Sequence, residues 1–213
     1  MVSFGSISHQ GIDGNLHFEK KYPKFAKSQI ILMETFSPFP YRELETERLL
    51  LRKMEERDLP QLLEMRSDPR VMKYIPRPIA KSLEDMQEML QMIQETVAKG
   101  EGIHWGIFTK TNPRLIGGIG YYRCQRANFR GEIGYMLHPD FQGKGLMQEA
   151  VETVLNYGFK EMEFHSVEAH IHPDNEASIG VMTRNNFVKE AHLRENTFHN
   201  GAFEDTLIFS LIR

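Results

Sequence analysis

The segment HPDFQGKGLMQEA, residues 138–150, combines residue types that bind anions. Gly143 and Gly145 flank Lys144, Gln142 precedes them, and a stretch with helical spacing follows. The first N–H groups of a helix are unpaired and lie at the positive end of its dipole, so such a loop can hold a phosphate. Glycines let the backbone approach that phosphate without a Cβ atom in the way. The alternative is a plain strand-to-helix turn that is tightened by its glycines.

Two nucleotide-binding motifs are excluded for this loop. A P-loop requires G-x-x-x-x-G-K followed by Ser or Thr, whereas Gly145 follows Lys144 and His138 occupies the first glycine position. A dinucleotide fingerprint requires a third glycine three residues after the second, where this sequence has Gln148. The loop can therefore still bind an anion, although it contains neither nucleotide-binding motif.

Composition limits the class of protein. The chain has 213 residues, which suits one domain, and its net charge of −3 gives no basic footprint for nucleic acid. No apolar run approaches the roughly 20 residues that a membrane helix needs, and the first 30 residues lack the apolar core of a secretory signal. The single cysteine, Cys124, cannot form an internal disulfide. We expect a cytoplasmic protein in which Cys124 is a structural residue rather than a nucleophile.

The elements that position the loop follow from periodicity and turn residues. Residues 1–42 lack periodicity and predict an extension, with Met33 as an alternative start, whereas residues 43–213 predict the folded domain. Strands are predicted at 48–54, 103–110, 115–123, 131–137, 166–172, 187–193 and 203–212. Helices are predicted after Asp58 as far as Pro69, from Ser82 to about Ala98, at 146–160 and after Asn175. This order favours an α+β domain with a mixed sheet.

The same loop resembles a known motif. DFQGKGLMQEA is similar to the Q/R-x-x-G-x-G/A coenzyme A signature of the GNAT superfamily of N-acetyltransferases, with Asp140 where Gln or Arg is usual. Three segments resemble, in the same order along the chain, segments of the ribosomal-protein N-acetyltransferases (RimJ/RimL-like), a branch of that superfamily. They are LETERLLLRKMEERD, GEIGYMLHPDFQGKG and HPDNEASIGVMTRNNF. The resemblance covers about residues 45–213.

That resemblance implies a GNAT fold: a mixed, mostly antiparallel seven-stranded sheet with helices on both faces and splayed fourth and fifth strands. Acetyl-CoA is the implied cosubstrate, no metal is expected, and the pantetheine arm would pair with the fourth strand near Met136 and Leu137. Asn175 would contact the pantetheine or cap its helix. The backbone amides expected to hold the pyrophosphate are those of Gln142, Gly143, Lys144, Gly145, Leu146 and Met147.

Acetyl transfer to an amine needs a neutral amine, donors for the developing oxyanion and a proton for the departing thiolate. Glu132 is the first candidate base, because it shares a strand face with Met136; the alternative is a structural ion pair with Arg130 or Arg123. Glu195 is a second candidate base. The N–H of Leu137 is the candidate oxyanion donor. Ser178, the serine of N-x-x-S, is the candidate acid, since the tyrosine of many relatives is replaced by Met182; capping or a hydrogen bond to coenzyme A is its alternative role.

The acceptor is expected to be a protein N-terminal amine or a small-molecule amine, because the sequence has no strongly acidic funnel for a polycation. Tyr74, Tyr121 and Tyr122 are candidate acceptor contacts. Because Tyr121 and Tyr122 are neighbours on one strand, they cannot both face the core, and one of them is expected to line the acceptor groove. His170 and His172 share a strand face, but without an evident third ligand a half-buried structural pair is expected. No nucleic acid or membrane partner is expected, and the chain is predicted to be a monomer or homodimer. The rival hypotheses are a non-catalytic acyl-CoA-binding module and a nucleotide-binding protein.

Overall fold

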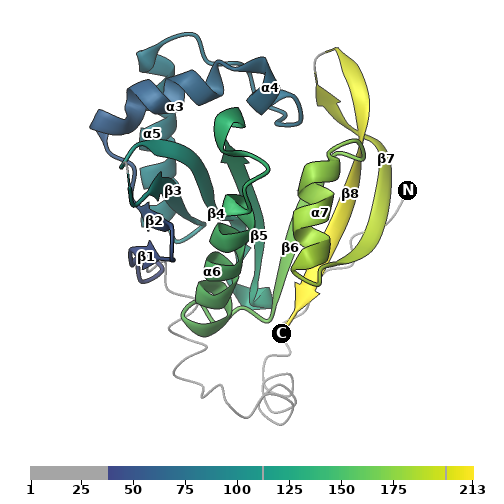
Figure 1. Cartoon of the computed structure of the whole chain (residues 1–213). Coiled ribbons are helices and arrows are strands. Elements are labelled where there is room, and N and C mark those ends of the chain that lie inside the picture. The colour runs from purple at the N-terminus through teal and green to yellow at the C-terminus, as the bar shows by residue number, and fades with distance from the viewer. Residues whose placement is uncertain (1–37, 112, 200) are drawn as a thin grey trace, which may run out of the picture. The chain divides into compact units, whose positions relative to one another are not determined.

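The sheet is the frame of the molecule. The structure is a computed structural model that describes residues 38–111, 113–199 and 201–213. Its strands lie in the order β1-β2-β3-β4-β5-β6-β8-β7 (Figure 1). They are β1 (Leu44–Glu45), β2 (Leu49–Arg52), β3 (Ile103–Thr109), β4 (Leu115–Gln125), β5 (Arg130–Leu137), β6 (Ser166–Ile171), β7 (Val188–His199) and β8 (Ala202–Ile212). Neighbouring strands are antiparallel except for β5 and β6, which are parallel.

The sheet has one strand more than the seven predicted. The additional strand, β1, consists of two residues that pair with β2 through Leu44 opposite Leu51. Two residues are too few to show the alternation on which a strand prediction depends. The predicted α+β architecture with a mixed, mostly antiparallel sheet is confirmed.

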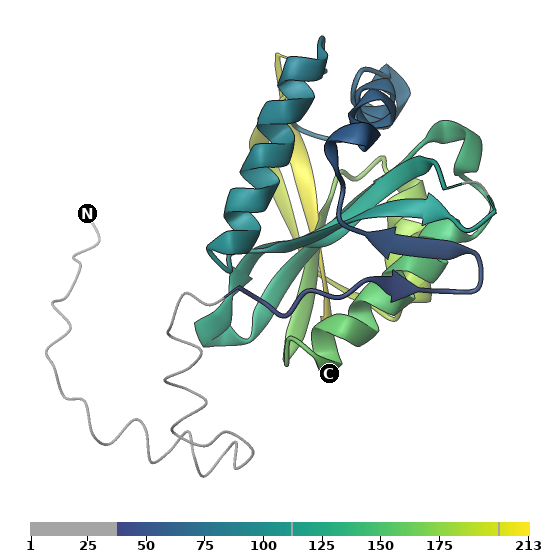
Figure 2. The ribbon, with the colours of Figure 1, turned by 90° about the vertical axis from the view of Figure 1, so that its left-hand side faces the viewer.

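Five α-helices cover the sheet in the described residues: α3 (Leu59–Arg66), α4 (Pro69–Met72), α5 (Leu83–Ala98), α6 (Leu146–Lys160) and α7 (Glu176–Arg184). The same residues include three short 3-10 turns: η1 (Glu56–Asp58) between β2 and α3, η2 (Arg126–Asn128) between β4 and β5, and η3 (Pro139–Phe141) between β5 and α6. Figure 2 shows α5 and α6 on opposite faces of the sheet. The α6 bounds agree with the predicted 146–160, and α5 begins after Ser82, whose hydroxyl accepts from Asp85 N at 3.3 Å.

One predicted cap is wrong. Asp58 precedes α3 but makes no side-chain capping bond, because its carboxylate accepts two hydrogen bonds from Arg52, at 2.8 and 2.9 Å, and one from Glu55 N at 2.9 Å. A bidentate guanidinium pair is stronger than a neutral cap. The Arg52 guanidinium also stacks on the Phe108 ring, 3.7 Å from the ring centroid. Pro69 does end α3, as predicted, but it also begins α4.

Each face of the sheet carries its own core. The larger core lies under α6 and α7 and includes Trp105, Ile119 and Tyr121, whereas the smaller lies under α3 and α5 and includes Leu62, Phe108 and Leu115. No described helix is long and apolar enough to cross a membrane.

The described chain joins the larger core before the predicted domain boundary. Phe39 is 8% exposed, Tyr41 stacks on Trp105 at 5.7 Å, and the Trp105 indole N–H donates to the Arg42 carbonyl at 2.8 Å. Residues 38–42, which the sequence assigned to the extension, therefore belong to the packed body. The rest of that predicted extension, residues 1–37 with Met33, lies outside the described residues.

Gly158 of α6 is required by a tyrosine of the sheet. The Tyr121 hydroxyl donates to the Val154 carbonyl at 2.9 Å, and a Cβ added at Gly158 would lie 2.3 Å from that hydroxyl oxygen. We therefore expect Gly158→Ala to lower the free energy of unfolding by about 1–3 kcal/mol, as overpacking of a core typically does. Denaturant unfolding followed by circular dichroism measures this change.

Gly180 of α7 provides the matched control. A Cβ there would meet only the flexible tip of Arg184, at 3.2 Å. Gly180→Ala should be neutral or stabilise the protein by up to about 1 kcal/mol through helix propensity. Equal destabilisation by both substitutions would show that helix geometry, rather than Tyr121, selects glycine at position 158.

Candidate active site

The central strands separate along most of their length. The parallel pairing of β5 with β6 covers only Arg130–Glu132 opposite Ser166–Glu168, although β5 continues to Leu137 and β6 to Ile171. Beyond Glu132 and Glu168 the two strands diverge, with α6 and α7 on either side of the opening (Figure 1). Backbone groups of β5 that face this opening have no strand partner there.

The N–H of Leu137 faces the opening. His138 N–H donates to the Ile116 carbonyl at 2.8 Å, so these two residues form a hydrogen-bonded pair of the β4–β5 ladder. Such pairs alternate with non-hydrogen-bonded ones, which makes Met136 with Gly118 a bonded pair and Leu137 with Gly117 a non-bonded pair. The Leu137 carbonyl, on the same side as its N–H, accepts from Gln142 Nε2 at 3.0 Å. The N–H and C=O groups of Met136 therefore pair with β4, whereas the N–H groups of Tyr135 and Leu137 face the opening.

The glycine loop links β5 to α6 as the sequence predicts. Gly143 and Gly145 have φ values of +72° and +76°, a region that favours glycine, and Gly145 directly precedes α6. A Cβ at Gly143 would meet no protein atom within 4 Å. Lys144 turns its ammonium back to the Asp140 carbonyl, at 2.7 Å, so its backbone rather than its side chain is placed for an anion.

Arg48, which precedes β2, fixes the loop from outside. Its Nη1 donates to the Lys144 carbonyl at 2.9 Å and its Nη2 lies 2.6 Å from Glu149 Oε2. Thr46 also hydrogen-bonds Glu149. This network draws the outer part of the loop and the first turn of α6 onto the β1–β2 hairpin. The Gln142 N–H, which was predicted to bind the pyrophosphate, is already occupied, because it donates to the Pro139 carbonyl at 3.1 Å.

On the α7 side, Asn175 is the predicted helix cap: its side-chain oxygen accepts from Ser178 N at 3.2 Å. The Ser178 hydroxyl is not used for capping. Met182 is fully buried. Tyr135, which the sequence analysis missed, extends from β5 toward the same helix, and its hydroxyl lies 3.5 Å from the Ser178 carbonyl. Burial raises the pKa of Tyr135 to about 12, so it remains protonated at neutral pH.

Glu132 lies where β5 and β6 part. Its carboxylate is 3.0 Å from Arg123 Nη1, one of the two ion pairs considered as an alternative to catalysis, whereas Arg130 pairs with Glu168. The Glu132 side chain is 15% exposed, and its Oε2, the atom that faces Arg123, is buried and lacks hydrogen-bond geometry with the described residues. The carboxylate therefore keeps lone pairs that can accept a proton.

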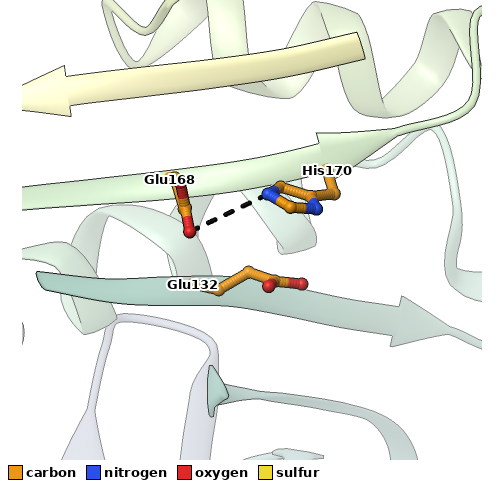
Figure 3. A group of neighbouring side chains, drawn as sticks. All are labelled: Glu132, Glu168 and His170. Atoms are coloured by element: carbon orange, nitrogen blue, oxygen red, sulfur yellow. Dashed lines mark ion pairs between the residues drawn. The ribbon is translucent and has the colours of Figure 1, made fainter. Parts of the chain in front are cut away.

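Figure 3 shows Glu132 extending from β5 and both Glu168 and His170 extending from β6. One ligand atom from each residue lies within 4.8 Å of the others, as a metal site would require. Both carboxylates already have an arginine partner, and His170 Nε2 is 3.8 Å from Glu168. Since two guanidiniums supply the positive charge, we assign this cluster no metal role. His172 does not join it but stacks on Tyr74, with 5.1 Å between ring centroids.

The two adjacent tyrosines of β4 separate as alternation requires. Tyr121 is 1% exposed in the core under α6, so the prediction that it contacts the acceptor is wrong. Tyr122 projects to the opposite face, that of α3 and α5, where its ring packs over Gly134 and against His104. A Cβ at Gly134 would lie 2.9 Å from that ring. Tyr122 remains a candidate acceptor contact, as does Tyr74, whose hydroxyl donates to the Asp174 carbonyl at 3.0 Å.

Three further side chains have limited chemical use in this structure. Burial lowers the pKa of His104 to about 4, so its imidazole is neutral, and burial raises the pKa of the Cys124 thiol to about 12, which makes it a poor nucleophile. Glu195 lies at a bulge of β7 with φ of +49° and is exposed. Of the two candidate bases, only Glu132 lies beside the opening.

Comparisons with known proteins agree with this geometry. The model of the family described as acetyltransferase (GNAT) domain matches residues 48–188. The sequence is 35% identical over 170 residues to the N-acetyltransferase p20 of Bacillus licheniformis, covering 80% of this chain and 96% of that protein. It is 26% identical over 180 residues to the ribosomal protein uS5-alanine N-acetyltransferase of Escherichia coli, covering 82% and 93%.

Solved structures give the same result for the fold. A GNAT-family acetyltransferase from Bacillus anthracis superimposes with a TM-score of 0.72 at 27% identity, covering 80% of this chain and 98% of that one. The ribosomal-protein α-N-acetyltransferase RimL in complex with coenzyme A superimposes with a TM-score of 0.75 at 21% identity, covering 80% and 98%.

The glycine loop gives a direct test of the anion site. Gly143→Ala places a Cβ in the space open to a ligand, at a φ that costs an alanine about 1–2 kcal/mol. We expect it to raise the dissociation constant of coenzyme A at least about 10-fold, because the loop amides shift and the Cβ crowds the pyrophosphate. Isothermal titration calorimetry measures this constant.

Gly201→Ala is the matched control, since Gly201 has φ of +83° and equally open surroundings but lies in the β7–β8 turn. It should lower stability by a similar amount and leave coenzyme affinity unchanged. Unaltered binding by Gly143→Ala would remove this loop from the coenzyme site.

Proposed function

This chain belongs to the GNAT acetyltransferase family, and from that premise we propose that it moves the acetyl group of acetyl-CoA directly to a primary amine held in the same complex. It is an N-acetyltransferase, with acetyl-CoA as its cosubstrate. The observation that carries the direct mechanism is the early end of the β5–β6 pairing, which leaves the Leu137 N–H facing the space between a glycine loop and a glutamate.

In this proposal, the pyrophosphate of the coenzyme binds the backbone amides from Gly143 to Met147. The positive end of α6 and the left-handed glycines favour an anion there. The pantetheine arm runs from that loop along the open edge of β5, beside the Asn175-capped end of α7. The thioester carbonyl then lies against the Leu137 N–H, which stabilises the oxyanion as the amine attacks.

The amine approaches from the opposite face of the sheet, where Glu132, Met136 and Tyr122 project. An ammonium has no lone pair, so it must first lose a proton, which Glu132 accepts directly or through water. As the tetrahedral intermediate collapses, the C–S bond breaks and the thiolate takes a proton. Ser178 or Tyr135 supplies that proton, since both hydroxyl-bearing residues border the opening on the α7 side.

The acceptor is an amine of a small molecule or of a protein N-terminus. Two similar proteins are the ribosomal protein uS5-alanine N-acetyltransferase and the ribosomal L7/L12 α-N-protein acetyltransferase RimL, and a further structural neighbour is a spermidine N-acetyltransferase from Vibrio cholerae. An α-amine has a pKa near 8 and a lysine-like amine near 10.4, so an N-terminal α-amine is easier to deprotonate at neutral pH.

Release of free coenzyme A thiol from acetyl-CoA, with a panel of small amines and of peptides with free N-termini, tests the activity. We expect at least one amine to be acetylated, and Glu132→Gln to lower kcat/KM about 100-fold or more, because the proton acceptor is lost while coenzyme affinity is retained. Arg123→Gln is the matched control: it removes the ion pair but keeps the carboxylate, and should affect kcat much less.

Equal losses from Glu132→Gln and Arg123→Gln would reduce Glu132 to a structural ion-pair partner. Tight binding of acetyl-CoA without turnover of any amine would favour the alternative of a non-catalytic acyl-CoA-binding module. Binding of ATP or NAD in place of acetyl-CoA would contradict both.

The proton donor to the thiolate can be assigned with Ser178→Ala and Tyr135→Phe. Each substitution removes one hydroxyl, and the substitution of the true donor should lower kcat about 10- to 100-fold at pH 7 with little change in the KM for acetyl-CoA. Because the Tyr135 pKa of about 12 lies far above assay pH, its donation should not titrate below pH 10. If neither variant slows turnover, water protonates the thiolate.

A further inference from the structure

Arg66 and Arg77 form no ion pair with a carboxylate of residues 38–111, 113–199 or 201–213. Arg66 is the last residue of α3, and its carbonyl accepts from Ala80 N at 3.1 Å, which folds the segment containing Arg77 back onto the end of the helix. The Arg66 side chain is half-buried, and its Nε is buried without a hydrogen-bond partner.

The carboxylates nearest in sequence are already occupied. Glu64 pairs with Arg114 and lies 3.3 Å from His138 Nε2, and Asp68 pairs with Arg70 at 2.6 Å. The buried arginine of β2, Arg52, shows the usual arrangement, with a bidentate aspartate at 2.8 and 2.9 Å. Arg66 thus departs from the pattern that this domain follows for a comparable side chain.

An unpaired guanidinium that is partly removed from water is unfavourable. Burial lowers the pKa of Arg66 below its ordinary value, Tyr122 opposes that effect, and the charge of Arg77 adds to it. The two cations therefore repel each other in the absence of a ligand. A bound anion would remove this repulsion and provide acceptors for the N–H groups, including the Nε that now has none.

The pair lies on the acceptor side of the sheet. Tyr122, which interacts electrostatically with Arg66, Arg77 and Glu132, stands opposite Glu132 in the β4–β5 register, and its ring covers Gly134 between Glu132 and Met136. The coenzyme loop, by contrast, is tied through Arg48 to the β1–β2 hairpin and enters α6 on the other face. An anion held by Arg66 and Arg77 would therefore accompany the amine.

We propose that Arg66 and Arg77 bind a carboxylate of the acceptor, so that the substrate is an amine that carries an acidic group near its nucleophilic nitrogen. This specificity rests on the acetyltransferase function proposed above. The same two charges disfavour a second ammonium group, which argues against polyamines, and they help the reacting ammonium to lose its proton. The carboxylate can come from a free amino acid or from an acidic side chain near a peptide N-terminus.

Matched acceptor pairs distinguish these two sources. The first pair is glycine and glycinamide, and the second is the dipeptide amides Ala-Glu and Ala-Gln, each assayed by thiol release with the rate expressed per neutral amine. The wild-type chain should favour the acidic member of at least one pair about 10-fold or more. Arg66→Gln should cost the acidic member about 10- to 100-fold in kcat/KM and the neutral member less than about 3-fold.

Further variants separate this role from folding. Arg66→Lys keeps the charge but loses the bidentate fork, so it should retain part of the preference, and Arg77→Gln should reduce it less than Arg66→Gln. Arg57→Gln, at an exposed arginine paired with Glu55, is the control and should change neither acceptor. Thermal unfolding by circular dichroism and titration with coenzyme A should give wild-type values for all of these variants.

Three results would overturn the inference. Equal use of acidic and neutral acceptors by the wild-type chain would do so while leaving the acetyltransferase function intact, as would an equal loss on both members of a pair in Arg66→Gln. A weaker coenzyme affinity in Arg66→Gln would assign the anion to the coenzyme instead. Failure to acetylate any amine would remove the proposed function and this specificity together.

Discussion

The proposed active site depends on the point at which two parallel strands stop pairing. β5 and β6 share three residue pairs and then separate, although both strands continue. A sheet normally satisfies the N–H and C=O groups of an interior strand from both sides. Here one side of β5 is left to a ligand, so the same backbone that builds the sheet also provides a binding edge for an extended amide-containing molecule. Side chains then need only to act at the two ends of that edge.

Glycines on the proposed acceptor face of the sheet leave space for aromatic rings to lie against the strands. Gly118 and Gly134 lie where a Cβ would come within 3.0 Å of the His104 ring and within 2.9 Å of the Tyr122 ring, respectively. The rings can therefore lie flat on the sheet rather than stand away from it. Charge is balanced locally at the strand separation, where Glu132 and Glu168 each have an arginine. In the proposed specificity, the charge of Arg66 and Arg77, and not the total charge of the protein, selects the acceptor.

Local signals predicted the elements well, because they act over a few residues. The helix α6 follows a glycine and has regular apolar spacing, and α5 is marked by Ser82 with Asp85, so both starts were visible in the sequence. Asp58 was assigned wrongly because its true partner, Arg52, belongs to another element and competes with the helix end. The β1 strand was missed because two residues carry no period.

The site was only half visible for the same reason. The glycine loop and the Asn175 cap are contiguous motifs, and the structure has them as predicted. Alternation predicted that Tyr121 and Tyr122 face opposite ways, but which of them meets the core depends on which face α6 covers. Tyr135 approaches Ser178 from a distant part of the chain, and the isolation of Arg66 reflects the commitments of Glu64 and Asp68 to other partners. Such facts are properties of the packed molecule, and no single segment encodes them.

The bond from Arg48 to the Lys144 carbonyl has a thermodynamic meaning beyond anchoring. It connects the β1–β2 hairpin to the loop that we propose as the coenzyme site, so opening of the hairpin and binding at the loop are coupled in that proposal. Linkage is reciprocal: whatever free energy an attached hairpin contributes to coenzyme binding, the bound coenzyme must return as protection of the hairpin against local opening. The edge strand β1, the shortest strand of the sheet, should then be protected from local opening when coenzyme is bound, although β1 does not contact the proposed coenzyme site.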